Sequence, residues 1–477
     1  MKVKKTEKGG SYTMTAKRNS MVKLMTVFAL SMMLCLSMVL PSFAEPDKPK
    51  EYSEGIDSGN PAKAAITKIF KIPSDVPNPK STFTFKFTAV GMDDGEDTDG
   101  MPVIPEITIS FEANENSLND SEENDYRTVV KESADILSKF KLDPTEWIKG
   151  EGVYKYTVEE IEGGIPITDS EKEEASYSKA KYEIEIWVEK DKDGKLFARF
   201  VNAKTVTNFI DEYYSGEEGG KKVNPTPGGV NQKPEISIED DFSQVIFSNR
   251  YWKTDGGGEK DPTLSALDII KNVAGNGANR NKYFDFTVKV IQPSLINKPV
   301  DPDTNELIPR NYKAYVMDKN GNIVTDITAD AKNGVISGED SKGGYFLFTS
   351  NQSKVISLKD GQKLVFVDLH VGSKVEVEEA AAEGYLPKYE RTFGKLGEFP
   401  GEEGKAWGFP RTPDDPASLI YTIDGVNANT ATFTNTRTGA TPTGISVDEL
   451  PYIVMVGVAL AGLVAFVAVK YRRKDKY

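Results

Sequence analysis

Apolar and polar residues alternate in short runs along most of the chain between residues 63 and 437. Runs such as "STFTFKFTAV", "YKYTVEEI", "KYEIEIWVEK" and "KLFARFVNA" place every second side chain on one face, which is typical of β-strands with one buried face. Turn residues separate the runs, and "KDKDGK" and "DKNGN" have the composition of hairpin turns rather than of calcium-binding loops. The pattern predicts an all-β protein of the sandwich type.

One segment departs from this alternation. In "SEENDYRTVVKESADILSKF", the apolar residues Val130, Ala134, Ile136 and Leu137 recur at roughly helical spacing. We therefore expect a short helix to cross the first domain at this point.

Long apolar segments lie near both ends of the chain. "MVKLMTVFALSMMLCLSMVLPSFA" follows basic residues and ends with small ones, so residues 1–44 are predicted to be a secretion signal peptide. Lipidation of Cys35 is an alternative, but the residues just before this cysteine are not small. Residues 450–469 provide about 20 uncharged residues followed by a basic tail, which predicts a transmembrane helix with a cytoplasmic end. The chain between these segments is then exported.

Shifts in composition suggest how the exported part is organised. Residues 45–62 are polar and rich in Pro and Gly, as in a flexible leader, and the glycine-rich residues 253–263 resemble a linker. These boundaries predict one sandwich domain over 63–252 and a second over 264–437. A low-complexity loop is expected at 215–234, and residues 438–477 form the membrane end.

The bulk composition excludes several classes of function. The 477 residues are 38% hydrophobic and 28% charged, and 59 basic against 73 acidic residues give a net charge of −14, which disfavours binding to nucleic acid. Because Cys35 is the only cysteine and lies in the signal peptide, neither cysteine catalysis nor a zinc cluster is expected. The single histidine, His370, fits a strand end better than a catalytic base, and no metal site or cofactor is predicted. A hydrolytic enzyme is therefore disfavoured.

Polar residues recur on the predicted buried faces, in the same order in each domain. A lysine sits among apolar neighbours in the first strand of each domain, a glutamate continues an apolar face in a middle strand, and an asparagine follows an aromatic residue in the last strand. The two sets are Lys68, Glu160 and Asn249 in the first domain and Lys271, Glu379 and Asn435 in the second.

Two interpretations of these sets are open. In the simpler one each lysine and glutamate form a buried ion pair, which by itself is weak evidence of stabilisation. In the other, burial favours a neutral amine and a protonated acid, so that Lys68 attacks the side-chain amide of Asn249 with help from Glu160. Asn202, in "RFVNAK", competes with Asn249 as the partner of Lys68. The repetition of the whole set favours the second interpretation.

The residues resemble the two-domain backbone pilins of Gram-positive bacteria and are similar to the streptococcal T-antigen shaft pilin with its intramolecular isopeptide bonds. The resemblance covers most of residues 60–437 and is closest in "KNVAGNGANRNKYFDFTV", "YFLFTSNQSKVISLKDGQKL" and "LHVGSKVEVEEAAAEGY" of the second domain. It implies two immunoglobulin-like sandwiches of the collagen-adhesin B type. It also implies that each lysine lies in the first strand, each glutamate in a middle strand and each asparagine in the last strand.

The segment before the apolar C-terminal stretch looks like a sortase signal of such pilins. The pentapeptide "ATPTG" would be cleaved between its second threonine and its glycine; its residues are Ala440, Thr441, Pro442, Thr443 and Gly444. The first two depart from the residues common in those pilins, which leaves the sortase class open. A polymer also requires an acceptor lysine, for which the candidates are Lys204, Lys221, Lys222 and Lys233.

These features predict a structural subunit of a sortase-assembled pilus on the Gram-positive cell surface. Its partners would be a sortase, other pilin subunits in a covalent polymer and the cell-wall peptidoglycan, and its only chemistry would be its own autocatalytic crosslinking. The alternative is a wall-anchored adhesin or minor pilin that binds host matrix through loops such as 91–126.

Overall fold

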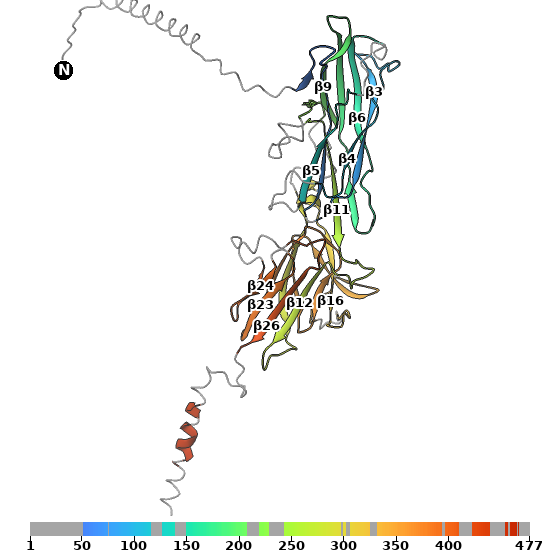
Figure 1. The fold of residues 1–477 in the computed structure, drawn as a ribbon. Helices are drawn as coiled ribbons and strands as arrows, with labels where there is room; N and C mark the ends of the chain where they lie inside the picture. Colours follow the sequence, from blue (N-terminus) through green and yellow to red (C-terminus); the bar gives the residue numbers. More distant parts are fainter. Residues whose placement is uncertain are drawn as a thin grey trace, which may run out of the picture. The chain divides into compact units, whose positions relative to one another are not determined.

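The computed structural model describes most of the chain between residues 51 and 438. The described ranges are 51–74, 76–115, 126–138, 149–207, 219–228, 243–296, 299–301, 306–324, 332–393, 396–409 and 422–438, together with 454–456, 458–464 and 466. Strands dominate these ranges, and the all-β class expected from the sequence is confirmed (Figure 1). The short 3-10 helix η1 (Ser294–Ile296) lies between strands.

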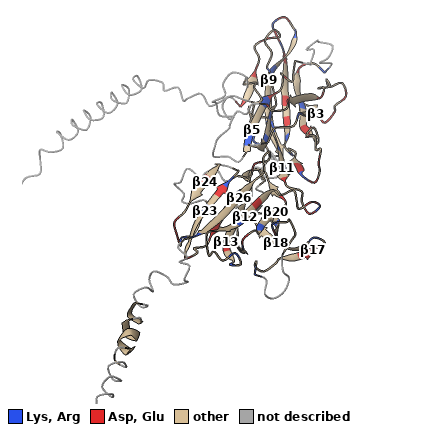
Figure 2. Cartoon of the chain, turned by 60° about the horizontal axis from the view of Figure 1, so that its bottom comes forward, with Lys and Arg blue, Asp and Glu red and all other residues tan. Residues whose placement is uncertain are grey.

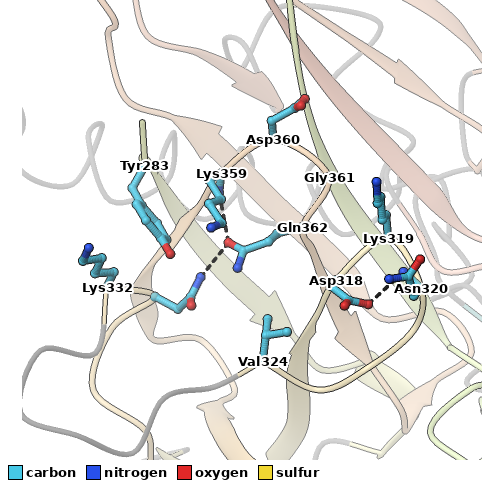
Figure 3. Close-up of a pocket in the computed structure, with 11 residues that line it drawn as sticks. Tyr283, Asp318, Lys319, Asn320, Val324, Lys332, Lys359, Asp360, Gly361 and Gln362 are labelled. Atoms are coloured by element: carbon cyan, nitrogen blue, oxygen red, sulfur yellow. Dashed lines mark hydrogen bonds between the residues drawn. The ribbon is translucent and has the colours of Figure 1, made fainter. Parts of the chain in front are cut away.

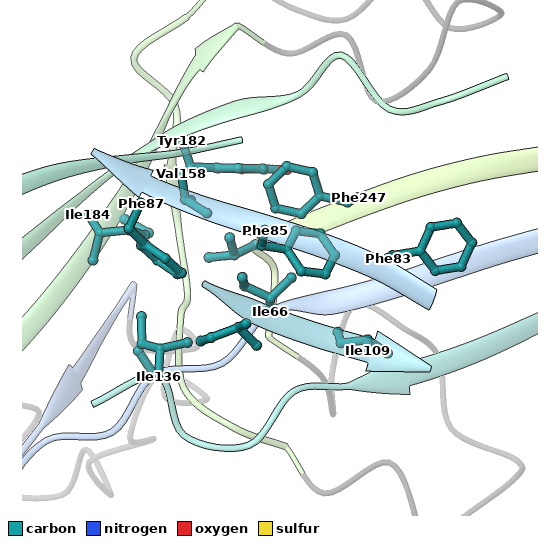
Figure 4. Packing of buried hydrophobic residues seen from close by; sticks show 14 of the residues in the cluster. Ile66, Phe83, Phe85, Phe87, Ile109, Ile136, Val158, Tyr182, Ile184 and Phe247 are labelled. Atoms are coloured by element: carbon teal, nitrogen blue, oxygen red, sulfur yellow. The ribbon is translucent and has the colours of Figure 1, made fainter. Parts of the chain in front are cut away.

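Two sheets share the first hydrophobic core. The larger sheet has the order β1 (Tyr52–Glu54), β9 (Leu196–Thr207), β8 (Lys181–Lys190), β6 (Gly152–Ile161), β3 (Ser81–Met92) and β4 (Ile107–Phe111), and β10 (Lys222–Val223) also pairs with β9. The other contains β11 (Ile246–Asp255), β2 (Thr67–Pro73) and β5 (Tyr126–Glu132), with β7 (Glu173–Ser176) on β11. Phe85 of β3 and Phe247 of β11 bring their ring centroids within 4.9 Å across this core (Figure 4). The two sheets therefore form a sandwich.

A second pair of sheets encloses a separate core. One has the order β17 (Gly338–Asp340), β18 (Gly343–Thr349), β16 (Asn311–Met317), β20 (Lys363–Phe366), β12 (Leu267–Ala274), β26 (Thr430–Arg437), β23 (Tyr385–Arg391) and β24 (Gly397–Pro400). The other has the order β19 (Ser353–Leu358), β13 (Phe284–Ile291), β22 (Lys374–Glu379) and β25 (Trp407–Phe409). Phe286 and Phe433 join the two sheets through an edge-to-face ring contact at 5.2 Å. A small ribbon pairs β14 (Pro299–Asp301) with β15 (Glu306–Leu307).

In each sandwich the first core strand lies beside the last, and the two run parallel. β2 pairs with β11 in the first sandwich, and β12 pairs with β26 in the second. All other pairs among the described strands are antiparallel. Parallel neighbours need a long connection, here the whole remainder of the domain. Segments distant in sequence are thereby brought side by side.

The helix expected around Val130 and Ile136 is wrong where the structure describes this segment. Residues 126–132 form β5, which pairs antiparallel with β2 along its whole length. The apparent helical spacing combines residues of two elements, because Ile136 lies in a turn beyond the strand. The backbone N–H of Ile136 donates to the backbone carbonyl of Ala64. The run of β-branched residues Thr128, Val129 and Val130 suits a strand, and pairing with β2 overrides the apparent helical period.

Other local expectations are partly confirmed. Part of the expected flexible leader is a strand, since β1 pairs with β9 and Ser53 is buried. The closing strand β11 runs into the expected linker, where Thr254 and Asp255 pair with β21 (Leu369–His370). Both hairpin turns are confirmed, with Asp191 and Asp318 accepting backbone N–H groups within their own turns.

The two terminal segments predicted from the sequence lie mainly outside the described residues. These are the signal peptide, with Cys35, and part of the apolar stretch 450–469, of which positions 454–456, 458–464 and 466 are described and helical. No helix in the described part of the chain has the length and apolar composition required to cross a membrane. The membrane-spanning segment stays a prediction.

Candidate functional site: two buried lysine, glutamate and asparagine sets

The parallel strand pairs place each lysine beside its asparagine. Lys68 of β2 lies opposite Phe247 of β11, and Asn249 is two residues further along β11 on the same face. The register is identical in the second sandwich, where Lys271 of β12 lies opposite Phe433 of β26 and Asn435 is two residues further along. The same offset in both copies sets each lysine diagonally across from its asparagine.

The glutamates come from the opposite sheets. Glu160 lies on β6, which pairs with β3, and Glu379 lies on β22, which pairs with β13. In each sandwich these strands belong to the sheet opposite the one that contains the lysine. Each side chain crosses the interior of its sandwich to reach the lysine and the asparagine. All three members of a set therefore depend on both sheets being packed together.

The contacts in the first set are short. The Nζ atom of Lys68 lies 2.6 Å from Oε2 of Glu160, and the Nδ2 atom of Asn249 donates to Oε1 of the same carboxyl group at 2.5 Å. Glu160 thus bridges the amine and the amide. The lysine and asparagine are 0% exposed and the glutamate residue is 8% exposed.

The second set repeats this arrangement. The Nζ atom of Lys271 lies 2.9 Å from Oε1 and 3.1 Å from Oε2 of Glu379, and Nδ2 of Asn435 donates to Oε1 of that glutamate. The lysine is 0% exposed, and the glutamate and asparagine are each 1% exposed. The small gap beside Glu379 and Asn435 has no room for a water molecule. The Glu379 and Asn435 side chains are therefore held in a dry environment.

Burial shifts the protonation of the second set toward its uncharged form. It lowers the pKa of Lys271 to about 8, against an ordinary value of 10.5, although the nearby Glu379 carboxylate acts in the opposite direction. Burial also raises the pKa of Glu379 above its ordinary value, against the opposing effect of Lys271. Both shifts favour a neutral amine beside a protonated acid, because removal from water disfavours the charged form of each group.

Aromatic residues of an F-x-F motif cover each set. The Nζ atom of Lys68 lies 4.3 Å from the ring centroid of Phe83, and that of Lys271 lies 4.3 Å from the ring centroid of Phe284. Two residues further on, Phe85 pairs with Glu160 across the strands and Phe286 pairs with Glu379. The sequence analysis did not assign these phenylalanines to the site. The shared spacing in "FTF" and "FDF" is the signal that identifies them.

The two asparagine oxygens differ in their surroundings. Oδ1 of Asn249 accepts a hydrogen bond from the backbone N–H of Ser178 at 2.8 Å. Oδ1 of Asn435 is buried and has no hydrogen-bond partner among the residues that the structure describes. A donor at the amide oxygen stabilises negative charge that develops there when the carbonyl carbon is attacked. The first set has such a donor in the backbone, whereas in the second set Glu379 contacts the amide nitrogen of Asn435.

The structure separates the competing asparagine from the site. Asn202 lies on β9 of the larger sheet, is only partly buried and pairs with Tyr52 and Glu185 along the strands. Lys68 lies on β2 of the other sheet. Asn249, not Asn202, is therefore the asparagine that shares Glu160 with Lys68.

Three of the candidate acceptor lysines are described. Lys204 is paired with Glu183 at 2.6 Å and with Glu185 at 3.4 Å, and the hydrogen bond that it donates to Glu183 raises its pKa. Lys221 and Lys222 are exposed beside β9, and Lys222 is part of β10. Lys233 and the pentapeptide Ala440–Gly444 lie outside the described residues.

The single histidine of the chain is buried in the core and is not accessible as a base. His370 is buried in β21 beside Tyr312, and burial lowers its pKa to about 3. Within the described ranges, no group of three or more His, Cys, Asp or Glu side chains is placed to hold a metal ion.

Comparison with known proteins gives one family model and several solved structures of low similarity. Residues 265–437 match the family described as Domain of unknown function (DUF7601). No curated protein matches the chain. The major pilin protein T3.2 from Streptococcus pyogenes serotype GAS13637 is similar at 18% identity and a TM-score of 0.26, with 82% of this chain and 100% of that chain covered.

Two further solved structures are similar to the chain. The major pilin from Streptococcus pyogenes has 16% identity and a TM-score of 0.24, with 79% of this chain and 99% of that chain covered. The pilus-presented adhesin Spy0125 (Cpa) has 14% identity and a TM-score of 0.20, with 58% of this chain and 38% of that chain covered.

The assignment of Asn249 predicts a difference between two variants. If Lys68 reacts with Asn249, the Asn249→Ala chain loses one fewer ammonia than the parent chain, each measured against its own encoded mass. The Asn202→Ala chain loses as many as the parent. Intact-mass spectrometry checks this, and a first-sandwich bond that survives Asn249→Ala would contradict the assignment.

The pKa shifts predict how crosslinking in the second sandwich depends on pH. Raising the pH from about 6 to about 8 should accelerate the reaction, because the neutral fraction of Lys271 grows as its pKa of about 8 is approached. The proposed reaction also uses the protonated form of Glu379, and burial raises the pKa of this carboxyl group above its ordinary value.

The measurement follows the mass of urea-unfolded Glu160→Ala chain after dilution into buffers of different pH, so that only the second sandwich reacts. A rate that rises only near the ordinary lysine pKa of 10.5 would contradict the role of burial.

Proposed function

We propose that the chain is a structural subunit of a sortase-assembled cell-surface pilus, and that each sandwich joins its first strand to its last through a lysine–asparagine isopeptide bond. The observation that carries the proposal is the duplicated geometry of the two sets. Both have the same parallel register, the same bridging glutamate and the same aromatic cover. An incidental buried ion pair does not require an asparagine at a fixed diagonal position.

The reaction is an intramolecular amide exchange. The neutral Nζ amine of the lysine attacks the side-chain carbonyl carbon of the asparagine, while the protonated glutamate donates its proton to the amide oxygen. The resulting carboxylate then accepts a proton from the attacking nitrogen, delivers it to the departing nitrogen, and takes back the proton on the oxygen as the carbonyl re-forms. The C–N bond of the side-chain amide breaks, a new bond to Nζ forms, and one ammonia leaves. Each domain reacts once on itself, so the chain is not an enzyme.

The position of each bond suits a protein that is under tension. In the second sandwich the bond would join β12 to the adjacent β26, and a pull between the domain ends would pass through this covalent link. Each bond would close a loop of roughly 160 to 180 residues, for which the chain-entropy model developed for disulfides gives about 5 kcal/mol. That contribution is comparable with the whole stability of a typical domain, about 5 to 15 kcal/mol.

The ends of the sequence support placement on the cell surface. A secretion signal over residues 1–44 would export the chain, and residues 450–469 would hold it in the membrane. A sortase would cleave between Thr443 and Gly444 and transfer the threonine carbonyl to an amine of another subunit or of peptidoglycan. Lys221 and Lys222 are exposed amines near an edge of the first sandwich and are candidates to accept it.

The catalytic role of the acid predicts a specific change in mass. The exported chain should be lighter than its encoded mass by two ammonia molecules, and Glu379→Ala should restore one of them because the second-sandwich reaction loses its proton carrier. Glu378→Ala is the matched control, since Glu378 is the exposed neighbour on the same strand. A Glu379→Ala chain that still lacks two ammonia molecules would refute this role.

Polymer formation separates the proposal from its alternative. Cell-wall extracts boiled in detergent should show a ladder of covalent multimers, and substitution of Thr443 should reduce it to the monomer. A wall-anchored adhesin or minor pilin would instead give a monomer band, even with both crosslinks formed. A single band from wild-type cells would therefore disprove the shaft-subunit assignment while leaving the crosslinks intact.

A further inference from the structure

A cavity of about 790 Å³ lies in the second sandwich. Its lining comes from the residue before β13, the turn after β16, the loop before β17 and the turn between β19 and β20. Figure 3 shows Tyr283, Lys332 and Lys359 on one side, Asp318, Lys319 and Asn320 on the other, and Gln362 between them. A volume of this size is within the range of small-molecule sites, about 300 to 1,000 Å³.

Three lysines in this cavity are not neutralised. Within the described part of the chain, Lys319, Lys332 and Lys359 form no ion pair, whereas many other described lysines do. The Nζ atom of Lys359 instead lies 5.7 Å from the ring centroid of Tyr283. In a chain of net charge −14, with charges of both signs spread over its strands (Figure 2), a group of unpaired ammonium ions is a distinct local feature.

The two carboxylates in the lining are already engaged. Asp318 accepts the backbone N–H groups of Asn320 and Asn322 and the side-chain amide of Asn322. Asp360 accepts the backbone N–H of Val273 and forms an ion pair with Arg280 at 2.9 Å. Both carboxylates therefore already stabilise the turns and the neighbouring strand through these contacts. The ammonium groups of the three lysines are therefore available to bind an anion.

Buried amides supply hydrogen-bonding groups at the base of the cavity. Gln362 is 5% exposed, and its Oε1 accepts the backbone N–H of Lys359 and the side-chain amide of Asn333. Its Nε2 makes no hydrogen bond to the described residues, although a glutamine amide has two N–H donors. The ring of Tyr283 stands beside it with the hydroxyl directed toward the cavity (Figure 3). An aromatic face, free amide donors and ammonium groups are thus combined in one hollow.

We propose that this cavity binds an acidic saccharide. The ring of Tyr283 can lie against the apolar face of a sugar, the amides can bond its hydroxyl groups, and the lysines can pair with its carboxylate or sulfate groups. This site is distinct from the lysine–asparagine sets and does not depend on crosslinking. A neutral saccharide would have no charged group to pair with the lysines. An acidic peptide would have no sugar ring to pack against Tyr283.

Calorimetric titration of the purified full-length chain tests the proposal. The probes are a sulfated heparin tetrasaccharide, a carboxylated hyaluronan tetrasaccharide, neutral maltotetraose and the peptide tetraglutamate. At least one acidic saccharide should bind more tightly than both maltotetraose and tetraglutamate, and its affinity should fall as salt is raised. The two acidic saccharides distinguish sulfate from carboxylate recognition.

Variants locate the binding. Lys332→Gln combined with Lys359→Gln should weaken the acidic saccharide by about tenfold or more, the loss expected for charged hydrogen bonds. Tyr283→Ala should weaken it by about fivefold through loss of the ring contact. Lys86→Gln is the matched control for removal of an exposed, unpaired lysine, because Lys86 lies on β3 of the first sandwich, and it should bind as the parent does.

Three outcomes would overturn the proposal. These are absence of binding by both acidic saccharides, affinity unchanged in the Lys332 and Lys359 double variant, and equal affinity for tetraglutamate. The intact mass of each variant shows whether its two crosslinks have formed, so that a folding defect is recognised separately. Gln362 is left unchanged because its backbone carbonyl accepts the N–H of Lys271.

Discussion

The burial of a lysine beside a glutamate, away from water, is the interaction on which the rest of this structure depends. As a charged pair, Lys271 and Glu379 would be costly to remove from water, and such pairs are often no more stabilising than apolar residues of similar volume. As a neutral pair they are reactive, and their pKa shifts point in that direction. The dry surroundings that make the pair a poor stabiliser thus make it suited to forming a covalent bond, which would remove the charge permanently.

Strand order turns this local chemistry into a mechanical property. Because the first and last core strands pair in parallel, each proposed bond would span nearly the entire domain in sequence while joining immediate neighbours in space. A disulfide would serve the same purpose in an exported protein, but the only cysteine lies in the predicted signal peptide. An amide also resists reduction. The proposed bonds would therefore give each sandwich a covalent closure that needs no cysteine.

Much of the site was predictable because it rests on period-two alternation, which places Lys68 and Glu160 on buried faces directly from the sequence. What alternation cannot give is which strand lies beside which, so Asn202 and Asn249 were distinguishable only once β11 was seen beside β2. The prediction of a helix near Val130 was wrong for a related reason, because pairing with β2 outweighed the helical spacing of the apolar residues. The contact from Ser178 to Asn249 could not be anticipated, because a backbone N–H carries no side-chain signature.

Peptide mapping of the folded, exported chain tests the central claim most directly. After tryptic digestion, the account predicts two branched fragments, one joining the peptide of Lys68 to that of Asn249 and one joining the peptide of Lys271 to that of Asn435. Each fragment should lack one ammonia relative to the sum of its two peptides. Recovery of both lysine peptides in linear form, with each asparagine side chain intact, would contradict the account.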